Sequence, residues 1–401
     1  MSLGTDPSRG RSLTNPPLVA RMRPHQRSIF GDMSALATQV GAINLGQGFP
    51  DTEGPELVRD AALSAIRAGR GAQYPPAHGV PELRAAICRH QAEWYGLHWD
   101  PGTEVVVATG ASEAIVATIL ALVEPGDEVI VLEPWFDLYA AAIALAGGVR
   151  VPVPPVPGTF RPDPAAVRAA VTTRTRLLLV NSPHNPTGVV FTTAELAALA
   201  AVAIDHDLIV LADEAYEHLW FDGHPHVPLA TLPGMAERTI TVGSAGKSLS
   251  FTGWKVGWAT GPADLIGAVR VVRQHLSYVS GGPFQYAVAE GLTQLPATFW
   301  ERARSDLAER AELLGEGLSR VGLTVLPSEG TYYLMTDVTA LGFGSAASFC
   351  AELPGRAGVV AIPVDALCDH SEVGRTWVRW AFCKRPEVLQ EAIRRLTAAL
   401  G

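Results

Sequence analysis

Two lysines lie within an apolar and aromatic stretch of the chain, "SAGKSLSFTGWKVGW" at residues 244–258. Lys247 and Lys255 have Ser, Gly, Ala, Phe and Trp as neighbours. An ammonium group is strongly hydrated, so it gains nothing from such surroundings. A lysine whose amine is kept deprotonated by burial and by nearby cations can, however, form a Schiff base with an aldehyde. An isolated lysine is more often a surface-loop residue, so the chemical interpretation depends on the groups around it.

Polar and aromatic residues follow each of five apolar runs that have the composition of buried strands. Ligands of open α/β sheets bind beyond the carboxyl ends of the strands, so these residues are expected to meet at one edge of a sheet. In chain order, residues 104–109 lead into Gly110, Ala111 and Ser112, residues 127–134 into Trp135 and Phe136, residues 175–183 into Asn185, residues 208–212 into Asp213 and Tyr216, and residues 239–243 into Ser244 and Lys247.

A single ligand would satisfy all of these groups. A helix that begins with small residues binds phosphate at its N-terminus, and a flat side chain such as Phe136 can stack on a planar ring. A buried Asp213 needs a cation, which a protonated pyridine nitrogen would supply. Ser244 and Lys255 can add to phosphate binding, and Tyr216 and Asn185 can hydrogen-bond a phenolic oxygen. Phosphate, pyridine, phenol and an aldehyde for Lys247 occur together in pyridoxal 5′-phosphate, the cofactor we therefore expect.

The elements that must position these residues alternate along the chain. Strand-like runs (104–109, 127–134, 175–183, 208–216, 239–244 and 255–260) are separated by helical patterns such as 112–123 and 193–207. Continuous apolar strands between amphipathic helices predict a parallel sheet that is covered on both faces. After about residue 290 the pattern changes to a long charged helix at 299–322 and then to mixed strands and helices, which indicates an α+β lobe.

The predicted fold class is therefore α/β, a three-layer α/β/α arrangement with a mostly parallel sheet and a smaller α+β domain. We expect residues 1–18, which are polar and rich in Pro and Gly, to be a disordered tail. Residues 53–291 are assigned to a large cofactor-binding domain. Residues 19–52 and 292–401 are assigned to the small domain with an N-terminal arm.

Composition narrows the class of protein. The chain of 401 residues is 48% hydrophobic and 18% charged, as in ordinary globular enzymes, and its net charge of −9 argues against nucleic acid as a partner. Its apolar runs are shorter than the roughly 18 residues that span a membrane, and the first 18 residues lack the apolar region of a secretory signal. The four cysteines (88, 350, 368 and 383) form no CxxC pair and are typical of reduced thiols, so a cytoplasmic location is expected.

Three short motifs suggest other chemistry but do not support it. "GQGFPD" lacks the third glycine and the preceding strand of a dinucleotide-binding loop. "HPH" at 224–226 is a histidine pair without an evident third ligand, so no metal site is expected. His184 is expected to support its neighbours or face solvent rather than act as a base, because Lys247 already supplies one.

The motifs "NSPHNPTG", "DEAYEHL", "GSAGKSLSFTGWKVGW" and "VRWAF", in this order, resemble the hallmark segments of class I/II aminotransferases, which have the fold-type-I architecture of pyridoxal-phosphate enzymes. The resemblance runs from about residue 25 to the end of the chain. "INLGQGFPD", "QYPPAHG", "LEPWFDLY" and "CKR" are similar to the kynurenine, glutamine and methionine aminotransferase branch, and more closely to bacterial N-succinyldiaminopimelate aminotransferases.

The resemblance implies a role for each matched residue. Lys247 would carry the Schiff base and move the proton between the substrate Cα and C4′ of the cofactor. Asp213 would pair with the pyridine nitrogen, and Arg379 would bind the substrate α-carboxylate. The remaining matches are Tyr216 and Asn185 for the phenolic oxygen, Phe136 for ring stacking, Gly110, Ala111, Ser112, Ser244 and Lys255 for the phosphate, Gly48 for the substrate backbone, and Tyr74 for a phosphate contact across a homodimer interface.

Structural alternatives exist for several of these residues. Asp213 could cap a helix, and Asn185 could serve turn chemistry alone. Arg379 alternates with apolar residues and could be an edge-strand charge that faces solvent. Lys255 could extend from an edge strand to solvent, Trp135 could stack on the ring in place of Phe136, and Tyr74 could be a packing residue of the interface.

The expected activity is a ping-pong transfer of an amino group between an amino acid and a 2-oxo acid. The leading substrate pair is glutamate and N-succinyl-2-amino-6-ketopimelate, an intermediate of lysine biosynthesis. The alternative is a broad kynurenine, glutamine, methionine or aromatic aminotransferase, with β-lyase activity on cysteine conjugates, and the aromatic residues Trp135, Phe251 and Trp254 are compatible with it. A non-catalytic regulator that binds the cofactor is a more remote alternative, because no helix-turn-helix precedes the matched region.

Overall fold

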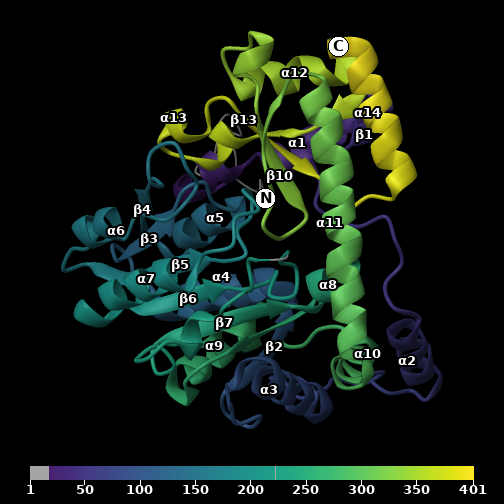
Figure 1. The fold of residues 1–401 in the computed structure, drawn as a ribbon. Coiled ribbons are helices and arrows are strands. Elements are labelled where there is room, and N and C mark those ends of the chain that lie inside the picture. The colour runs from purple at the N-terminus through teal and green to yellow at the C-terminus, as the bar shows by residue number, and fades with distance from the viewer. Residues whose placement is uncertain (1–17, 222) are drawn as a thin grey trace, which may run out of the picture.

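A computed structural model describes residues 18–221 and 223–401, so the tail predicted at 1–18 lies, except for Leu18, outside the described residues (Figure 1). A seven-stranded sheet with the order β2-β8-β7-β6-β5-β3-β4 forms its centre. Strand β8 is antiparallel to both of its neighbours, and the other pairings are parallel. The mostly parallel α/β sheet predicted from the sequence is thereby confirmed. The strands are β2 (Val105–Thr109), β3 (Glu128–Leu132), β4 (Val149–Val153), β5 (Thr175–Asn181), β6 (Ile209–Asp213), β7 (Thr239–Ser244) and β8 (Val256–Thr260).

Helices cover both faces of this sheet, because its strands are apolar at successive positions. Val129 and Val131 of β3 pack with one set of helices, whereas Ile130 and Leu132 pack on the opposite face. The first face carries α4 (Gly110–Leu122), α5 (Asp137–Ala146) and α9 (Ala263–Leu276). The second face carries α6 (Pro164–Ala170) and α7 (Thr193–Asp205), and, beside β2 and β8, α2 (Glu56–Arg67), α3 (Pro81–Tyr95) and α10 (Gly282–Gln294).

A smaller α+β unit lies beside the sheet. Its antiparallel sheet has the order β12-β13-β10-β9, and β1 pairs in parallel with β11. Helix α11 (Ala297–Arg320) extends from the side of α10 up to this unit (Figure 1). The other elements are β1 (Ile43–Asn44), β9 (Thr324–Leu326), β10 (Tyr333–Asp337), β11 (Val359–Val360), β12 (Ile362–Pro363), β13 (Trp377–Ala381), α1 (Ile29–Val40), α12 (Ala346–Ala357), α13 (Ser371–Gly374) and α14 (Pro386–Leu400). The domain boundaries placed at 52/53 and 291/292 stay a prediction.

Local sequence signals explain where helices begin and end. Helix α7 starts with a capping box, in which the Thr192 side chain accepts from the Glu195 N–H and the Glu195 carboxylate accepts from the Thr192 N–H. Helices α1 and α3 end at Gly41 and Gly96, both in the left-handed conformation that glycine adopts at little cost. Among the described residues, no helix is both long and apolar enough to cross a membrane.

The strand pairing brings the carboxyl ends of the parallel strands to one edge. Asn181 at the end of β5 lies opposite Asp213 at the end of β6, and Asp213 lies opposite Val242 of β7. Ser244, at the end of β7, lies opposite Gly257 of the antiparallel β8. A four-residue helix, α8 (Ala245–Ser248), follows Ser244 directly and carries Lys247.

Close packing of β8 against the start of α4 predicts that Gly257→Ala destabilises the protein. A Cβ atom at Gly257 would lie 2.5 Å from the backbone nitrogen of Ala111, so the first turn of α4 would have to move. Overpacking of this kind costs about 1–3 kcal/mol, which thermal or urea unfolding can measure. Gly267→Ala in α9 is the matched control, because a Cβ atom there meets nothing within 4 Å and alanine favours a helix. Equal stability of the two variants would contradict the prediction.

Candidate active site

A cavity of about 360 Å³ opens at the carboxyl edge of the large sheet, between that sheet and the α+β unit. Every residue predicted for the site lines this cavity except Tyr74. The predicted lining residues are Gly48, Gly110, Ala111, Ser112, Phe136, Asn185, Asp213, Tyr216, Ser244, Lys247, Lys255 and Arg379. They come from loops and strand ends that are far apart in sequence, so the sheet topology brings them together.

The amine of Lys247 lies in the cavity wall among tyrosine side chains. Its Nζ donates a hydrogen bond to the hydroxyl of Tyr332 at 2.9 Å and lies 5.7 Å from the ring centre of Tyr216. Burial lowers the pKa of Lys247 to about 8, and the positive charge of Lys255 acts in the same direction. A larger fraction of the amine is therefore neutral near neutral pH than in an exposed lysine, as a nucleophilic or basic amine requires.

Asp213 is a buried carboxylate at the end of β6. Its Oδ2 accepts a hydrogen bond of 2.6 Å from the hydroxyl of Tyr139 in α5, and its Oδ1 accepts one of 3.2 Å from the Ala215 N–H. Burial raises the pKa of this carboxyl, and the bond from Tyr139 opposes that shift. The Asp213 side chain is thus held by neutral donors, in a position where a cationic ligand group would be a favourable partner.

Arg379 of β13 is buried and faces the cavity, not solvent as an edge-strand charge would. Its Nη1 donates to Oδ1 of Asn185 at 2.9 Å, and its Nη2 donates to the carbonyl of Gly46. The guanidinium carbon lies over the rings of Phe30 and Tyr333, at 4.6 and 4.1 Å from their centres. Its Nε is buried without a hydrogen-bond partner, and no acidic side chain of the described residues forms an ion pair with it. This geometry fits a carboxylate ligand.

The first turn of α4 forms the opposite end of the cavity. Gly110, Ala111 and Ser112 begin this helix of 13 residues, and the side chain of Thr109 before it makes no capping bond. Lys255 donates to the Ser112 hydroxyl at 3.4 Å. A Cβ atom at Gly110 would lie 3.2 Å from the Lys255 amine, so glycine keeps the cation close to the helix end. Free N–H groups, a hydroxyl and a cation together fit a phosphate.

The aromatic residues of the site are distinguished by their positions. Phe136 lines the cavity and contacts Tyr139 and Phe30 edge-on or tilted, whereas Trp135 is buried outside the cavity beneath the guanidinium of Arg150. Phe136 is therefore the better placed of the two for stacking on a ligand. Phe251 and Trp254, which were associated with a broad specificity, stack on each other and do not line the cavity of the single chain.

Gly48 lies where no other residue fits. A Cβ atom there would come within 1.7 Å of the Tyr333 hydroxyl, and the Gly48 carbonyl accepts a 2.6 Å hydrogen bond from Tyr332. The expectation was that this glycine leaves space for a substrate. A Cβ atom at Gly48 would meet the two tyrosines, so the contact of this glycine with a substrate stays a prediction.

Tyr74 is the predicted site residue that lies apart from the cavity. Its side chain is 81% exposed and its ring contacts Tyr278 edge-on. Its contribution across a homodimer interface stays a prediction.

Several residues of the site were not identified from the sequence. They include Tyr139, Tyr332 and Tyr333, which hydrogen-bond or pack against predicted residues, and Ser28, Phe30, Gln47, Asp137, Asn181 and Thr252, which line the cavity. Tyr139 is the last residue of the quoted "LEPWFDLY", and Tyr333 is the first residue of β10, with Tyr332 directly before it. For Tyr139, the available signal was its place within that quoted motif.

Of the motifs set aside from the sequence, the histidine pair at 224–226 and His184 lie outside this cavity, whereas Gln47 and Gly48 of "GQGFPD" line it. His226 pairs with Glu214 at 3.1 Å, and His224 lies 3.7 Å from Glu329. His184 is buried and bonded to the Thr187 hydroxyl at 2.6 Å, so it does not face solvent. Burial lowers the pKa of His184 to about 4.

The lowered pKa of Lys247 predicts a specific pH dependence of stability for the protein without bound ligand. Between about pH 8 and the ordinary lysine value of 10.5, the unfolded chain holds a proton that the folded chain has released. The free energy of unfolding therefore rises with pH over this range. Below pH 8 both states are protonated, and the folded state bears the full cost of burying the charge. Lys247→Met should therefore be more stable than the unmodified protein at pH 7, with an advantage that shrinks toward pH 10. Urea unfolding at several pH values tests this, and a constant difference would contradict it.

Comparison with known proteins supports the resemblance to class I/II aminotransferases that the sequence motifs indicated. A family model described as aminotransferase class I and II matches residues 40–396. A probable N-succinyldiaminopimelate aminotransferase of Mycobacterium tuberculosis is 50% identical over 390 residues, covering 94% of this chain and 98% of that protein. The solved structure of the M. tuberculosis N-succinyldiaminopimelate aminotransferase matches with a TM-score of 0.93 and covers 95% of this chain and 100% of that one.

Relatives with other names are also similar. A methionine aminotransferase of Escherichia coli is 38% identical over 387 residues, which cover 96% of this chain and 99% of that protein. A kynurenine–oxoglutarate transaminase of Dictyostelium discoideum is 36% identical and covers 91% and 92% of the two chains. The match of nearly the whole chain, together with the geometry of the cavity, shows that the chain belongs to the class I and II aminotransferases, which use pyridoxal 5′-phosphate.

Proposed function

We propose that this aminotransferase moves the amino group of glutamate to N-succinyl-2-amino-6-ketopimelate in lysine biosynthesis. The single observation that supports this substrate is the 50% identity, over nearly the full length of both chains, to a protein named as an N-succinyldiaminopimelate aminotransferase. The transferase activity itself follows from the family. The choice of acceptor is the part that needs testing.

The donor set of the cavity fits pyridoxal phosphate. The α4 N-terminus with Lys255 suits the phosphate, the buried Asp213 carboxylate suits a protonated pyridine nitrogen, and Phe136 lies where a ring could stack. When bound, the cofactor supplies an aldehyde that takes up amino groups and a ring that delocalises the electrons released when the substrate Cα loses its proton.

The chain's own residues then bind, orient and move protons. Arg379 pairs with the substrate α-carboxylate through its Nε, which has no other partner, and an adjacent guanidinium nitrogen. Asn185 holds the plane of the guanidinium. Lys247 moves the proton between the substrate Cα and C4′ of the cofactor, because its lowered pKa lets it act as a base near neutral pH. Tyr332, which accepts from Lys247 and donates to Gly48, orients the amine toward the cavity.

A broad methionine, kynurenine or aromatic aminotransferase is the second candidate. The similarity to the E. coli methionine aminotransferase favours it, as do the rings of Phe30, Phe136 and Tyr333 in the cavity wall. With either substrate, we also propose a homodimer in which Tyr74 reaches the site of the partner chain. A cytoplasmic location is proposed as well. The family membership argues against a non-catalytic regulator, and Lys247 lies in the cavity as an enzyme requires.

Borohydride treatment of the purified, cofactor-loaded protein should attach pyridoxal phosphate to the peptide that contains Lys247, as mass spectrometry can show. Lys247→Ala should abolish both the attachment and the transferase activity. Lys255→Ala is the matched control, because it should keep the attachment site but bind the cofactor roughly 10- to 100-fold more weakly after loss of one charged phosphate contact. Full activity of Lys247→Ala would overturn the assignment of this lysine.

A substrate panel separates the two candidate functions. With glutamate as donor, kcat/KM should be highest for N-succinyl-2-amino-6-ketopimelate and lower for the 2-oxo acids of methionine, phenylalanine and kynurenine. Specificity is a ratio of these values, so all acceptors must be compared on one enzyme preparation. If the succinylated acceptor is inert while the others react, the proposed substrate is wrong and the broad aminotransferase is favoured.

A further inference from the structure

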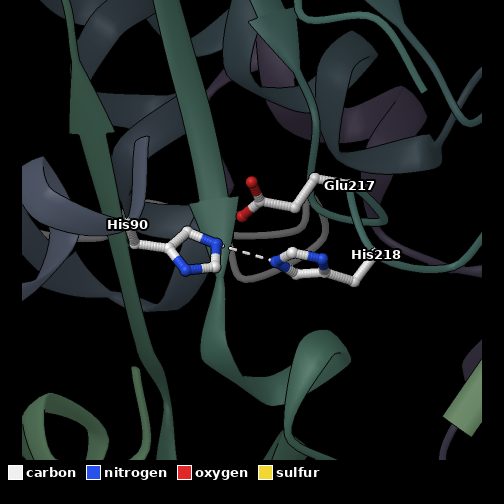
Figure 2. A group of neighbouring side chains, drawn as sticks. All are labelled: His90, Glu217 and His218. Atoms are coloured by element: carbon white, nitrogen blue, oxygen red, sulfur yellow. Dashed lines mark hydrogen bonds between the residues drawn. The ribbon is translucent and has the colours of Figure 1, made fainter. Parts of the chain in front are cut away.

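Three buried side chains outside the cofactor cavity bring their metal-binding atoms together. His90 belongs to α3, and Glu217 and His218 belong to the turn that follows β6. The ligand atoms of the three side chains lie within 4.8 Å of one another, and the two Nε2 atoms are 2.7 Å apart. Figure 2 shows the two rings facing each other through these atoms, with the Glu217 carboxylate directed toward the gap between them. Each of the three residues is 2% exposed.

Two polar atoms around this cluster have no partner. The Nδ1 of His218 and the Oε1 of Gln91 are buried without a hydrogen bond. The amide nitrogen of Gln91 contacts the Glu217 carboxylate at 3.3 Å, so its free oxygen lies next to the cluster. A buried polar atom without a partner is costly, and the Gln91 oxygen, which can only accept, is therefore available to a cation or a donor beside the cluster.

Aromatic rings close the cluster off from solvent. Trp300 stacks on His218 with ring centres 4.1 Å apart, and Trp94 contacts both imidazoles edge-on or tilted. Ionic bonds in such a dry environment are stronger than in water, and an uncompensated charge is correspondingly more costly.

The charges around the cluster favour a cation. The Glu217 carboxylate is buried, and the carboxylate of Glu214 belongs to the same turn. A buried carboxylate is costly unless it meets a cation or hydrogen-bond donors, so a metal ion at this position would be a favourable partner.

The histidines have the form that metals bind. The two Nε2 atoms are 2.7 Å apart in a buried setting, a hydrogen bond that requires at least one of them to carry no proton and to offer its lone pair. Neutral imidazole is the metal-binding state of histidine, and two imidazoles with one carboxylate form a common zinc ligand set.

We propose that His90, Glu217 and His218 bind one divalent transition-metal ion, with zinc as the ion they suit best. Two nitrogens bound to tetrahedral zinc at about 2.0–2.1 Å lie roughly 3.3 Å apart, so the rings need to separate by about 0.6 Å from their hydrogen-bonded distance of 2.7 Å. Two metal–nitrogen bonds replace that one hydrogen bond. The free Oε1 of Gln91 or a water molecule completes the coordination.

The proposal departs from the expectation, made from the sequence, that the chain holds no metal. His90 and His218 are 128 positions apart, so no spacing motif connects them. The ion would fasten the turn after β6 to α3. Because that turn begins next to Asp213 and contains Tyr216, the ion would stabilise the floor of the cofactor cavity without contacting it.

Metal analysis of the cofactor-loaded enzyme tests the proposal. Protein produced with zinc in the growth medium, then passed through gel filtration in metal-free buffer, should hold about one zinc ion per chain. It should melt about 2–5 °C above protein produced with a chelator, because an ion that binds only the folded state adds to its stability. Cobalt(II) in place of zinc should give the visible absorption of a tetrahedral site.

Variants locate the ion independently of catalysis. His90→Gln and His218→Gln should each lose the zinc and the cobalt spectrum, while the pyridoxal absorbance confirms that they fold. His184→Gln replaces another buried histidine and should keep the zinc. If a variant fails to fold, the cobalt spectrum of the unmodified enzyme still decides the question. The proposal is overturned if the unmodified enzyme retains no zinc. It is also overturned if His90→Gln retains as much zinc as the unmodified enzyme.

Discussion

Burial of unpaired charge at the carboxyl edge of the sheet is the constraint on which the rest of the structure depends. Asp213 has neutral donors but no cation, and Arg379 has amide and carbonyl acceptors but no anion. Burial lowers the pKa of Lys247, so a fraction of its amine is neutral near neutral pH. Each arrangement lowers the stability of the empty protein. Each also becomes favourable once a ligand supplies the opposite charge, so the cofactor and substrate stabilise what the chain alone cannot.

The scaffold explains why these charges stay in place. Strands with successive apolar residues, such as Val129–Leu132 of β3, are buried on both faces, and this packing holds the strands in place. Short connections follow directly: Asp213 ends β6, and the helix with Lys247 starts one residue after Ser244 ends β7. The α+β unit adds Arg379 and Tyr332 from the other side. The cavity therefore requires both parts of the chain, and its precision comes from the rigid strands rather than from the loops.

Sequence reasoning predicted the α/β class and the mostly parallel sheet because apolar runs and helical periodicity are local properties. It also named most of the residues around the cavity, since strand ends converge by topology. It did not predict that β8 is antiparallel, because direction depends on the connection between strands and not on the composition of "KVGWAT". It missed Tyr139, Tyr332 and the His90–Glu217–His218 cluster, whose contacts join distant segments. Tyr74 does not line the cavity of the single chain, so its predicted contact across a homodimer interface stays a prediction.

The turn after β6 connects the two polar centres of the large sheet. Asp213 and Tyr216 face the cofactor cavity, whereas Glu217 and His218 face the opposite way toward α3. Because Leu219 N–H binds the Tyr216 carbonyl and Glu217 N–H binds the Glu214 carbonyl, the turn is a short hydrogen-bonded unit. The buried cluster and Tyr216 therefore belong to one hydrogen-bonded turn, even though no side chain of the cluster lines the cavity.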